Sequence, residues 1–192
     1  KRIHVWGKDE LSYLARQINE TFEMLHVYSK QLEENQAQLE YEAHHDTLTG
    51  FPNRSFFVSR LNESLRKAHQ EKNGRCAVLF LDLDRFKLVN DSYNHEFGDR
   101  LLVELSHRLN RCVRGDDFVA RFGGDEFVIL LDHVTDESVA IEVADRIKRE
   151  LSMPFFIRDK SIFISASIGI TLVDGSDRPE DALRNADIAM YR

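Results

Sequence analysis

The stretch "RFGGDEFVILL" places two carboxylates directly after two glycines and before an apolar run. Phe118 to Phe122 and Phe127 to Leu131 have the aromatic and β-branched composition of short strands. Two glycines between such runs predict a tight hairpin, because glycine accepts the positive φ that these turns need. Asp125 and Glu126 are therefore expected just past a turn, at the mouth of a sheet. On one hairpin alone, the ordinary interpretation is that both carboxylates are only solvated.

A second stretch, "VLFLDLDRFKLVND", predicts an apolar strand that ends in Asp82 and Asp84. Carboxylates at the end of a buried strand must be solvated or bound to a cation. Oxygen ligands without a nearby His or Cys set suit Mg²⁺ or Mn²⁺, which also bind substrate phosphates, and Lys87 adds a nearby positive charge. Because strand side chains alternate, only one of Asp125 and Glu126 is expected to share a metal with Asp82 readily. Spacing alone does not choose between them.

The elements that must position these residues follow one another as in a single compact α/β domain. Gly50 and Pro52 in "HHDTLTGFPNR" end a first helix. Periodicity then predicts, in order, a strand from Cys76 to Asp82, a helix after Gly98 with Leu101, Leu105, Leu109 and Cys112 on one face, the hairpin, a helix carrying Ala140, Val143, Ala144, Ile147 and Leu151, a strand alternating at Ile162, Ile164, Ala166, Ile168 and Ile170, and a helix beginning near Pro179.

The N-terminal part has the seven-residue repeat of a coiled coil. The two seam positions are occupied by Leu11, Ile18, Leu25, Leu32 and Leu39, and by Leu14, Thr21, Tyr28 and Asn35. Thr21 and Asn35 are polar, which costs stability but can fix the register and the number of partners. The pattern predicts a homodimer through this helix. The alternative is a single solvated helix that packs on the domain.

Composition limits the function classes. A chain of 192 residues that is 42% hydrophobic can hold one domain with a sizeable core plus an appendage. The formal net charge of -7 argues against a general nucleic-acid binder. No run of about 18 apolar residues occurs, so this fragment is expected to be soluble. Cys76 and Cys112 have no metal-ligand spacing and are expected to be buried, reduced thiols, which suggests a reducing compartment.

The segment "GKDELSYLARQINETFEML" resembles the second helix of a HAMP module. Asp9, Glu10 and Leu11 match its acidic-acidic-aliphatic signature, and Ser12 replaces the usual glycine. Such modules connect membrane receptors to cytoplasmic outputs. The resemblance implies a longer, membrane-anchored parent protein with this part on the cytoplasmic side of the inner membrane. It also implies a HAMP-like and coiled-coil linker over residues 1–43 and a separate domain over residues 44–192.

From His44 to the end, the chain resembles the GGDEF family of diguanylate cyclases, because "DTLTGFPNR", "DLDRFKLVNDSYNHEFGD" and "GGDEF" occur in that order. The resemblance implies an α/β (α+β) fold like that of nucleotidyl cyclases and the polymerase palm, with a mainly antiparallel central sheet flanked by helices. It also implies a reaction in which two molecules of GTP form cyclic di-GMP and two pyrophosphates.

The same resemblance implies roles for individual residues. Asp82, the backbone carbonyl of Leu83 and Asp125 would hold two Mg²⁺ or Mn²⁺ ions, with Glu126 beside them as a possible further ligand and catalytic residue. Phe86 and Lys87 would bind the terminal phosphates, Asn90 and Asp99 would read guanine, and His95 would line the same pocket. Arg114 and Asp117, in the form RxxD, would make an inhibitory site for the product.

Two departures from the family pattern concern Asn94 and the end of the chain. Asn94 stands where the family has glycine, and asparagine is the next most tolerant residue for positive φ. The family's phosphate-binding lysine would follow Arg192, so the C-terminal end of the domain is expected to be truncated. Three alternatives stay open: a catalytically silent receptor for GTP or cyclic di-GMP, a plain dimerisation unit, and a purine cyclase with a monocyclic product.

Overall fold

The computed structural model describes residues 10–71 and 74–191. The chain divides between Ala43 and His44 into two units, which are described separately. Among the described residues, no helix combines the length and the apolar character that crossing a membrane requires.

Helix α1, Glu10–His44, forms the first unit and ends at the boundary. Five apolar side chains of the heptad seam are 55 to 72% exposed: Leu14, Leu25, Tyr28, Leu32 and Leu39. An apolar stripe without packing does not stabilise a helix in water, so the coiled coil stays a prediction. Of the HAMP-like signature, Asp9 and the side chains of Glu10, Leu11 and Ser12 lie outside the described residues.

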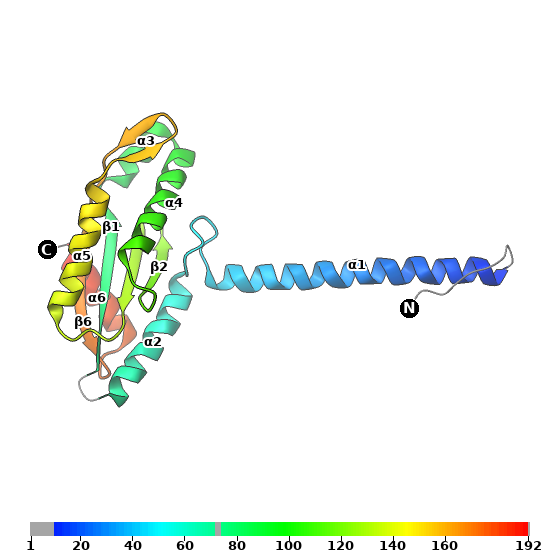
Figure 1. Ribbon diagram of the computed structural model, residues 1–192, viewed down its shortest axis with the longest axis horizontal. Helices are drawn as coiled ribbons and strands as arrows, with labels where there is room; N and C mark the ends of the chain where they lie inside the picture. The colour runs from blue at the N-terminus through cyan, green and yellow to red at the C-terminus, as the bar shows by residue number, and fades with distance from the viewer. Residues whose placement is uncertain (1–9, 72–73, 192) are drawn as a thin grey trace. The chain divides into compact units, whose positions relative to one another are not determined.

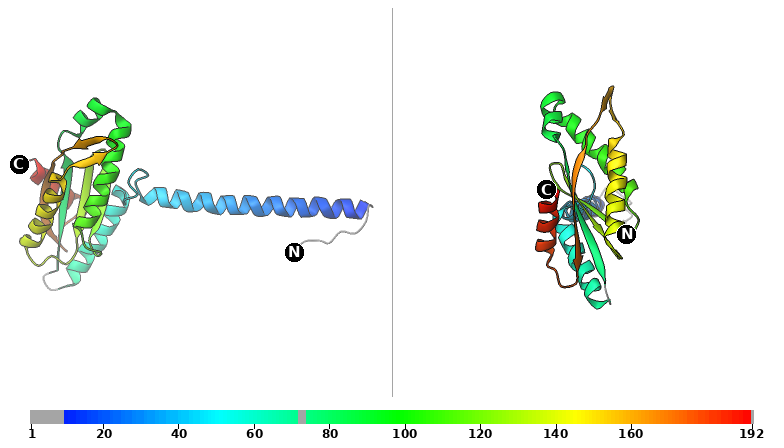
Figure 2. Two further views of the ribbon diagram at one scale, coloured as in Figure 1. Left: turned by 45° about the horizontal axis from the view of Figure 1, so that its top comes forward. Right: turned by 90° about the vertical axis from the view of Figure 1, so that its left-hand side faces the viewer.

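The second unit has a four-stranded sheet between two layers of helices (Figure 1, Figure 2). Its elements are α2 (Arg54–Gln70), β1 (Arg75–Leu83), α3 (Phe86–Tyr93), α4 (His95–Cys112), β2 (Phe118–Gly123), β3 (Glu126–Leu131), α5 (Glu137–Ser152), β4 (Phe155–Ile157), β5 (Lys160–Ile162), β6 (Ala166–Asp174) and α6 (Pro179–Met190). The expected fold class, helices around an antiparallel central sheet, is confirmed. So is the final helix at Pro179.

Strand β1 lies inside the sheet, whose order is β2-β3-β1-β6 with every neighbour antiparallel. Its side chains alternate between two cores. Ala77, Leu79, Leu81 and Leu83 pack in the core that includes residues of α4 and α5, and Cys76, Val78 and Phe80 pack in the core that includes residues of α2 and α6. A strand buried on both faces must be apolar throughout, so Asp82 near its end is the exception.

The strand predicted through Ile162 and Ile170 is wrong as a single element. It is two strands: β5 pairs with β4 in a separate two-stranded hairpin, and β6 joins the main sheet from Ala166 onward. Between them the Phe163 side chain is 72% exposed, and the Ser165 carbonyl accepts a 2.9 Å hydrogen bond from the Asp84 backbone N–H. The alternation of apolar residues continues through the break, so periodicity could not reveal it.

The helix predicted after Gly98 begins three residues earlier than that glycine, at His95. Asn94 is its N-cap, because its side-chain oxygen accepts a 2.9 Å hydrogen bond from the Phe97 N–H. The φ of Asn94 is 126°, as expected for a glycine position. Gly98 lies inside the helix at a point where α3 packs closely against α4. A Cβ at this position would be 1.9 Å from Asn90 Oδ1, so the close packing accounts for the glycine.

Candidate active site

The glycine turn joins β2 to β3, as the sequence predicts. Gly123 has a φ of 142° and Gly124 a φ of 51°, which are conformations that L side chains rarely adopt. A Cβ at either position would meet nothing within 4 Å. The backbone conformation, and not crowding, therefore requires glycine here. Asp125 lies in the turn itself, and Glu126 is the first residue of β3.

The register of the sheet brings the end of β1 to this turn. Asp82 is directly opposite Glu126 across the antiparallel pair, so the two side chains share one face. Asp125 is not in a strand, so the expected alternation does not place it on the opposite face. The register thus places Glu126 beside Asp82, and Asp125 lies next to Glu126 in the turn; which of the two shares a metal ion with Asp82 stays a prediction.

Electrostatics connect these carboxylates. Burial, followed by the charges of Asp125 and Glu126, raises the pKa of Asp82 to about 6. Burial, followed by the charges of Asp125 and Asp187, raises the pKa of Glu126 above its usual range. Such shifts are expected where burial and like charges outweigh the nearest counter-charge, which for Glu126 is Arg54. The carboxylates of Asp82 and Glu126 are therefore close enough to act on one another and on Asp125.

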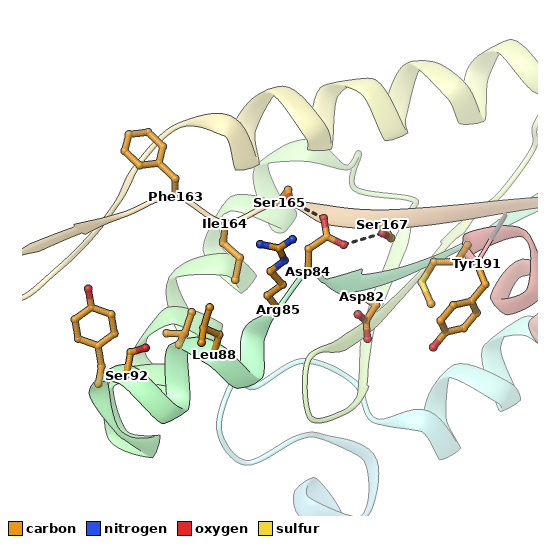
Figure 3. A pocket seen from close by; sticks show the side chains of 13 residues that line it. Asp82, Asp84, Arg85, Leu88, Ser92, Phe163, Ile164, Ser165, Ser167 and Tyr191 are labelled. Atoms are coloured by element: carbon orange, nitrogen blue, oxygen red, sulfur yellow. Dashed lines mark hydrogen bonds between the residues drawn. The ribbon is translucent and has the colours of Figure 1, made fainter.

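The second carboxylate at the end of the predicted strand, Asp84, already has hydrogen-bond partners in the chain. Its carboxylate accepts hydrogen bonds from the hydroxyls of Ser165 and Ser167, the latter at 2.7 Å (Figure 3). Arg85, beside it, caps α3 with a left-handed backbone at φ 61° and ψ 27°. Asp84 thus ties the end of β1 to the start of β6, which is a structural role.

Three hollows surround the predicted residues. A cavity of about 730 Å³ includes Asp82, Asp84 and Arg85 in its lining (Figure 3). A groove of about 390 Å³ between α4 and the β4–β5 hairpin includes Asp99. A third cavity of about 420 Å³ includes Glu126 together with residues of α2 and α6. The structure brings Asp82, Asp125 and Glu126 together, whereas Asp99 borders a different hollow from Asp82.

The predicted base-reading residues lie on α3 and α4. Asn90 Oδ1 is buried and has no hydrogen-bond partner among the described residues. Buried acceptors are almost always satisfied, so this oxygen calls for a donor from outside the described residues. Asp99 and His95 are exposed near the start of α4. Phe86 is buried at the start of α3, and the side chain of its neighbour Lys87 is exposed.

Arg114 and Asp117 form a closed turn before β2. The Arg114 N–H donates to the Asp117 carboxylate at 2.8 Å, and the Asp117 N–H donates to the Arg114 carbonyl at 3.1 Å. The Arg114 side chain is exposed. Burial raises the pKa of Asp117 against the opposing effect of that hydrogen bond. The turn is therefore complete without a ligand, and its guanidinium faces solvent.

Sequence reasoning missed Asp187 on α6. Its charge contributes to the raised pKa of both Asp82 and Glu126, and it borders the same cavity as Glu126. The sequence offers only a partial signal: Ala182 and Ala186 mark the buried face of α6 and Asp187 adjoins it, but where that face meets the sheet depends on the fold. Gly169 on β6 permits this approach, since a Cβ there would lie 2.0 Å from the Ala186 carbonyl oxygen.

The described residues contain no group of three or more His, Cys, Asp or Glu side chains placed to hold a metal ion. A metal ion here would need other donors as well, such as a backbone carbonyl, water or a bound phosphate.

The chain is similar in sequence to known proteins. The model of the family "Diguanylate cyclase, GGDEF domain" matches residues 43–192. The chain belongs to the GGDEF family. Diguanylate cyclase TpbB of Pseudomonas aeruginosa is 40% identical over 193 aligned positions, which cover all of this chain and 44% of TpbB. The chain thus spans less than half the length of this curated relative.

Solved structures of GGDEF domains have the same fold. The isolated GGDEF domain of P. aeruginosa TpbB superposes with a TM-score of 0.74 at 42% identity, covering 77% of this chain and 87% of that chain. The coiled coil and GGDEF domain of DgcB from Caulobacter crescentus, in complex with c-di-GMP, gives a TM-score of 0.76 at 26% identity, covering 94% and 93%.

Proposed function

We propose that this chain is a diguanylate cyclase that joins two molecules of GTP into cyclic di-GMP and releases two pyrophosphates. The observation that carries the proposal is the gathering of Asp82, Asp125 and Glu126 at the glycine turn, where their side-chain carboxylates have no hydrogen-bond or ion-pair partner among the described residues. In each of two equivalent steps, a 3′-oxygen bonds to the α-phosphorus of the other GTP. The bond to pyrophosphate breaks and the hydroxyl proton leaves.

The carboxylates fit divalent metal ions. Cyclases of this family generally need such ions, and hard cations prefer all-oxygen ligands. Asp82, the carbonyl of Leu83 and Asp125 would hold two Mg²⁺ or Mn²⁺ ions, with Glu126 beside them. The accumulated negative charge, visible in the raised pKa of Asp82, is what such ions would neutralise. When bound, they would stabilise charge on the α-phosphate and make the 3′-hydroxyl more acidic.

The substrate-binding residues lie on α3 and α4. The backbone N–H groups around Phe86 and Lys87, with the Lys87 ammonium, would bind the terminal phosphates. Guanine has N1–H and amino donors, which suit the orphaned oxygen of Asn90 and the carboxylate of Asp99, and His95 would line this pocket. Adenine has no N1–H donor, so this pair would favour GTP.

A cyclic product needs two nucleotides presented antiparallel, one from each of two domains, and the exposed apolar stripe of α1 is the device we propose for pairing them. Deleting residues 1–41 should lower cyclase activity, and the deficit should shrink as protein concentration rises. Activity per mole is to be measured over a wide concentration range. Concentration-independent activity in the deletion variant would show that α1 is not the assembly device.

The direct test of the reaction is incubation of the chain with GTP and Mg²⁺, followed by chromatography of the nucleotides. The proposal expects cyclic di-GMP and pyrophosphate. A monocyclic guanosine product would indicate a purine cyclase instead. Absence of turnover, with binding of cyclic di-GMP, would indicate a silent receptor.

We further propose that cyclic di-GMP inhibits the enzyme through Arg114 and Asp117. The exposed Arg114 guanidinium can pair with a phosphate or a guanine edge. Arg114→Ala should remove both product binding and product inhibition while leaving the initial rate unchanged, as measured by calorimetry and by progress curves. If Arg114→Ala binds cyclic di-GMP as tightly as the wild type, this segment is a structural turn and not an inhibitory site.

The parent protein is proposed to be longer and membrane-anchored, with this part on the cytoplasmic side. The support is the HAMP-like segment, together with the greater length of TpbB.

A further inference from the structure

Arg121 on β2 connects two segments that are far apart in the sequence. Its Nη1 donates to Asp46 Oδ1 at 2.7 Å, and its Nε and Nη2 donate to the Gly124 carbonyl at 3.1 and 2.8 Å. The Arg121 side chain is only 10% exposed. The planar guanidinium thus binds a carboxylate on one side and a backbone carbonyl on the other, and it fixes both directions at once, which the flexible point charge of a lysine ammonium would not do.

The carbonyl that Arg121 holds belongs to the Gly124–Asp125 peptide, so its orientation sets where the Asp125 side chain begins. Gly123 and Gly124 both have positive φ, and no atom lies near the place of a Cβ on either. A turn of two glycines has wide conformational freedom and little packing to limit it. The hydrogen bonds from Arg121 are therefore a restraint that the turn otherwise lacks.

Asp46 is itself fixed. Its carboxylate also accepts hydrogen bonds from the Thr49 N–H at 2.9 Å and the Thr49 hydroxyl at 2.7 Å. The backbone closes the same loop, since the Gly50 N–H donates to the Asp46 carbonyl at 2.8 Å. The Arg121 backbone N–H donates to the Pro52 carbonyl at 2.9 Å, so the loop is attached to β2 at two points.

We propose that Arg121 is a positioning residue that holds the Gly124–Asp125 peptide in its working orientation, with Asp46 as the group that orients the guanidinium. Arg121 does not touch the substrate in this account and acts through Asp125. The proposal assigns a role to the "DTLTG" segment, which the reaction itself leaves unused. Its effect on turnover rests on the proposed cyclase function, whereas its effect on the turn does not.

The test compares Arg121→Ala with Arg60→Ala. Arg60 makes a matched, partly buried ion pair with Asp132 at 2.7 Å and borders none of the three hollows. Amide hydrogen exchange at residues 123–126 should become about tenfold faster in Arg121→Ala and stay unchanged in Arg60→Ala. Unchanged exchange at the turn in folded Arg121→Ala would overturn the proposal, whether or not the wild type makes cyclic di-GMP.

Kinetics give the second readout. In Arg121→Ala, kcat should fall about 10- to 100-fold with KM for GTP within about threefold, because geometry and not binding is lost. Asp46→Asn keeps the shape of the side chain and the hydrogen bonds from Arg121 to Gly124, so kcat should fall less than in Arg121→Ala. This variant replaces Arg121→Ala in the test if the latter does not fold. The double variant should be no worse than Arg121→Ala. Additive losses, or an equal fall of kcat in Arg60→Ala, would show a general stability effect.

Discussion

The carboxylates at the glycine turn and two others in the same domain, Asp46 and Asp174, have opposite surroundings. The side-chain carboxylates of Asp82, Asp125 and Glu126 have no hydrogen-bond or ion-pair partner within residues 10–71 and 74–191, and the pKa of both Asp82 and Glu126 is raised by burial and by neighbouring charge. The fold places these groups together and leaves them unsatisfied.

Asp46, in the loop before α2, and Asp174, at the end of β6, accept hydrogen bonds from their neighbours. Burial alone would raise the pKa of Asp46, but hydrogen bonds from Thr49 and Arg121 hold it below its usual range. Hydrogen bonds from Ser176 do the same for the pKa of Asp174. In this domain, carboxylates that stabilise local structure thus receive hydrogen bonds from nearby donors. The unsatisfied set is therefore the place to expect a cation or a ligand.

Asp125→Asn should give the largest effect in this comparison. Cyclic di-GMP formation should fall by at least about 10²–10³-fold, because the variant loses a negative charge that stabilises the transition state through the metal ions. Asp174→Asn, the partnered control at the end of β6, should keep its activity. Product formation is measured alongside circular dichroism, and an active, folded Asp125→Asn would remove Asp125 from the site.

Asp99 extends the comparison to the groove beside α4. Asp99→Ala should weaken GTP binding by about 1.5–3 kcal/mol, the value of a hydrogen bond to a charged group, and should affect ATP less. Asp145→Ala, an exposed substitution on α5, is the control. Calorimetric titration with a non-hydrolysable analogue of each nucleotide measures this, and equal losses for both would exclude Asp99 from base reading.

The smallest effect in this comparison is the change in stability expected for Asp82→Asn, which is separate from the loss of activity expected for a metal ligand. Since the pKa of Asp82 is about 6 in the folded chain against 3.8 for an ordinary aspartate, folding favours its protonated form. Its contribution to stability is full below about pH 4 and is lost as pH rises through 6. The neutral amide avoids that loss, so the variant should be more stable than wild type by about 1 kcal/mol at pH 7.5, a value reduced for solvent screening. Urea unfolding at pH 4.5 and 7.5 tests this, and a variant destabilised at pH 7.5 would contradict it.

Local pattern was enough to predict the hairpin, the buried β1 strand and its acidic end, because each depends on neighbours in sequence. The glycine pair at 123–124 and the apolar run before Asp82 need no long-range information. The pairing of Asp82 with Glu126 depends on sheet register, which alternation alone left undecided.

Features that depend on distant packing could not be predicted. The break between β5 and β6 follows from strand pairing, since apolar residues alternate on both sides of it. The electrostatic influence of Asp187 needs α6 packed on the sheet, and the Arg121–Asp46 pair joins residues 75 positions apart. The individual roles of the site residues remain predictions.

The two cysteines give this chain a built-in reporter of unfolding. Cys76 and Cys112 are its only thiols, both are buried, and burial raises the pKa of Cys76 to about 12 and that of Cys112 above its usual range. The thiolate is the species that alkylating reagents attack, so the folded domain should react very slowly at neutral pH. Once the surrounding core opens, burial no longer raises the pKa of the thiol, and the cysteine reacts at the rate of an exposed one. Because Cys76 lies in the core beside α2 and Cys112 in the core beside α4, the order in which they are labelled would tell which side of the sheet opens first.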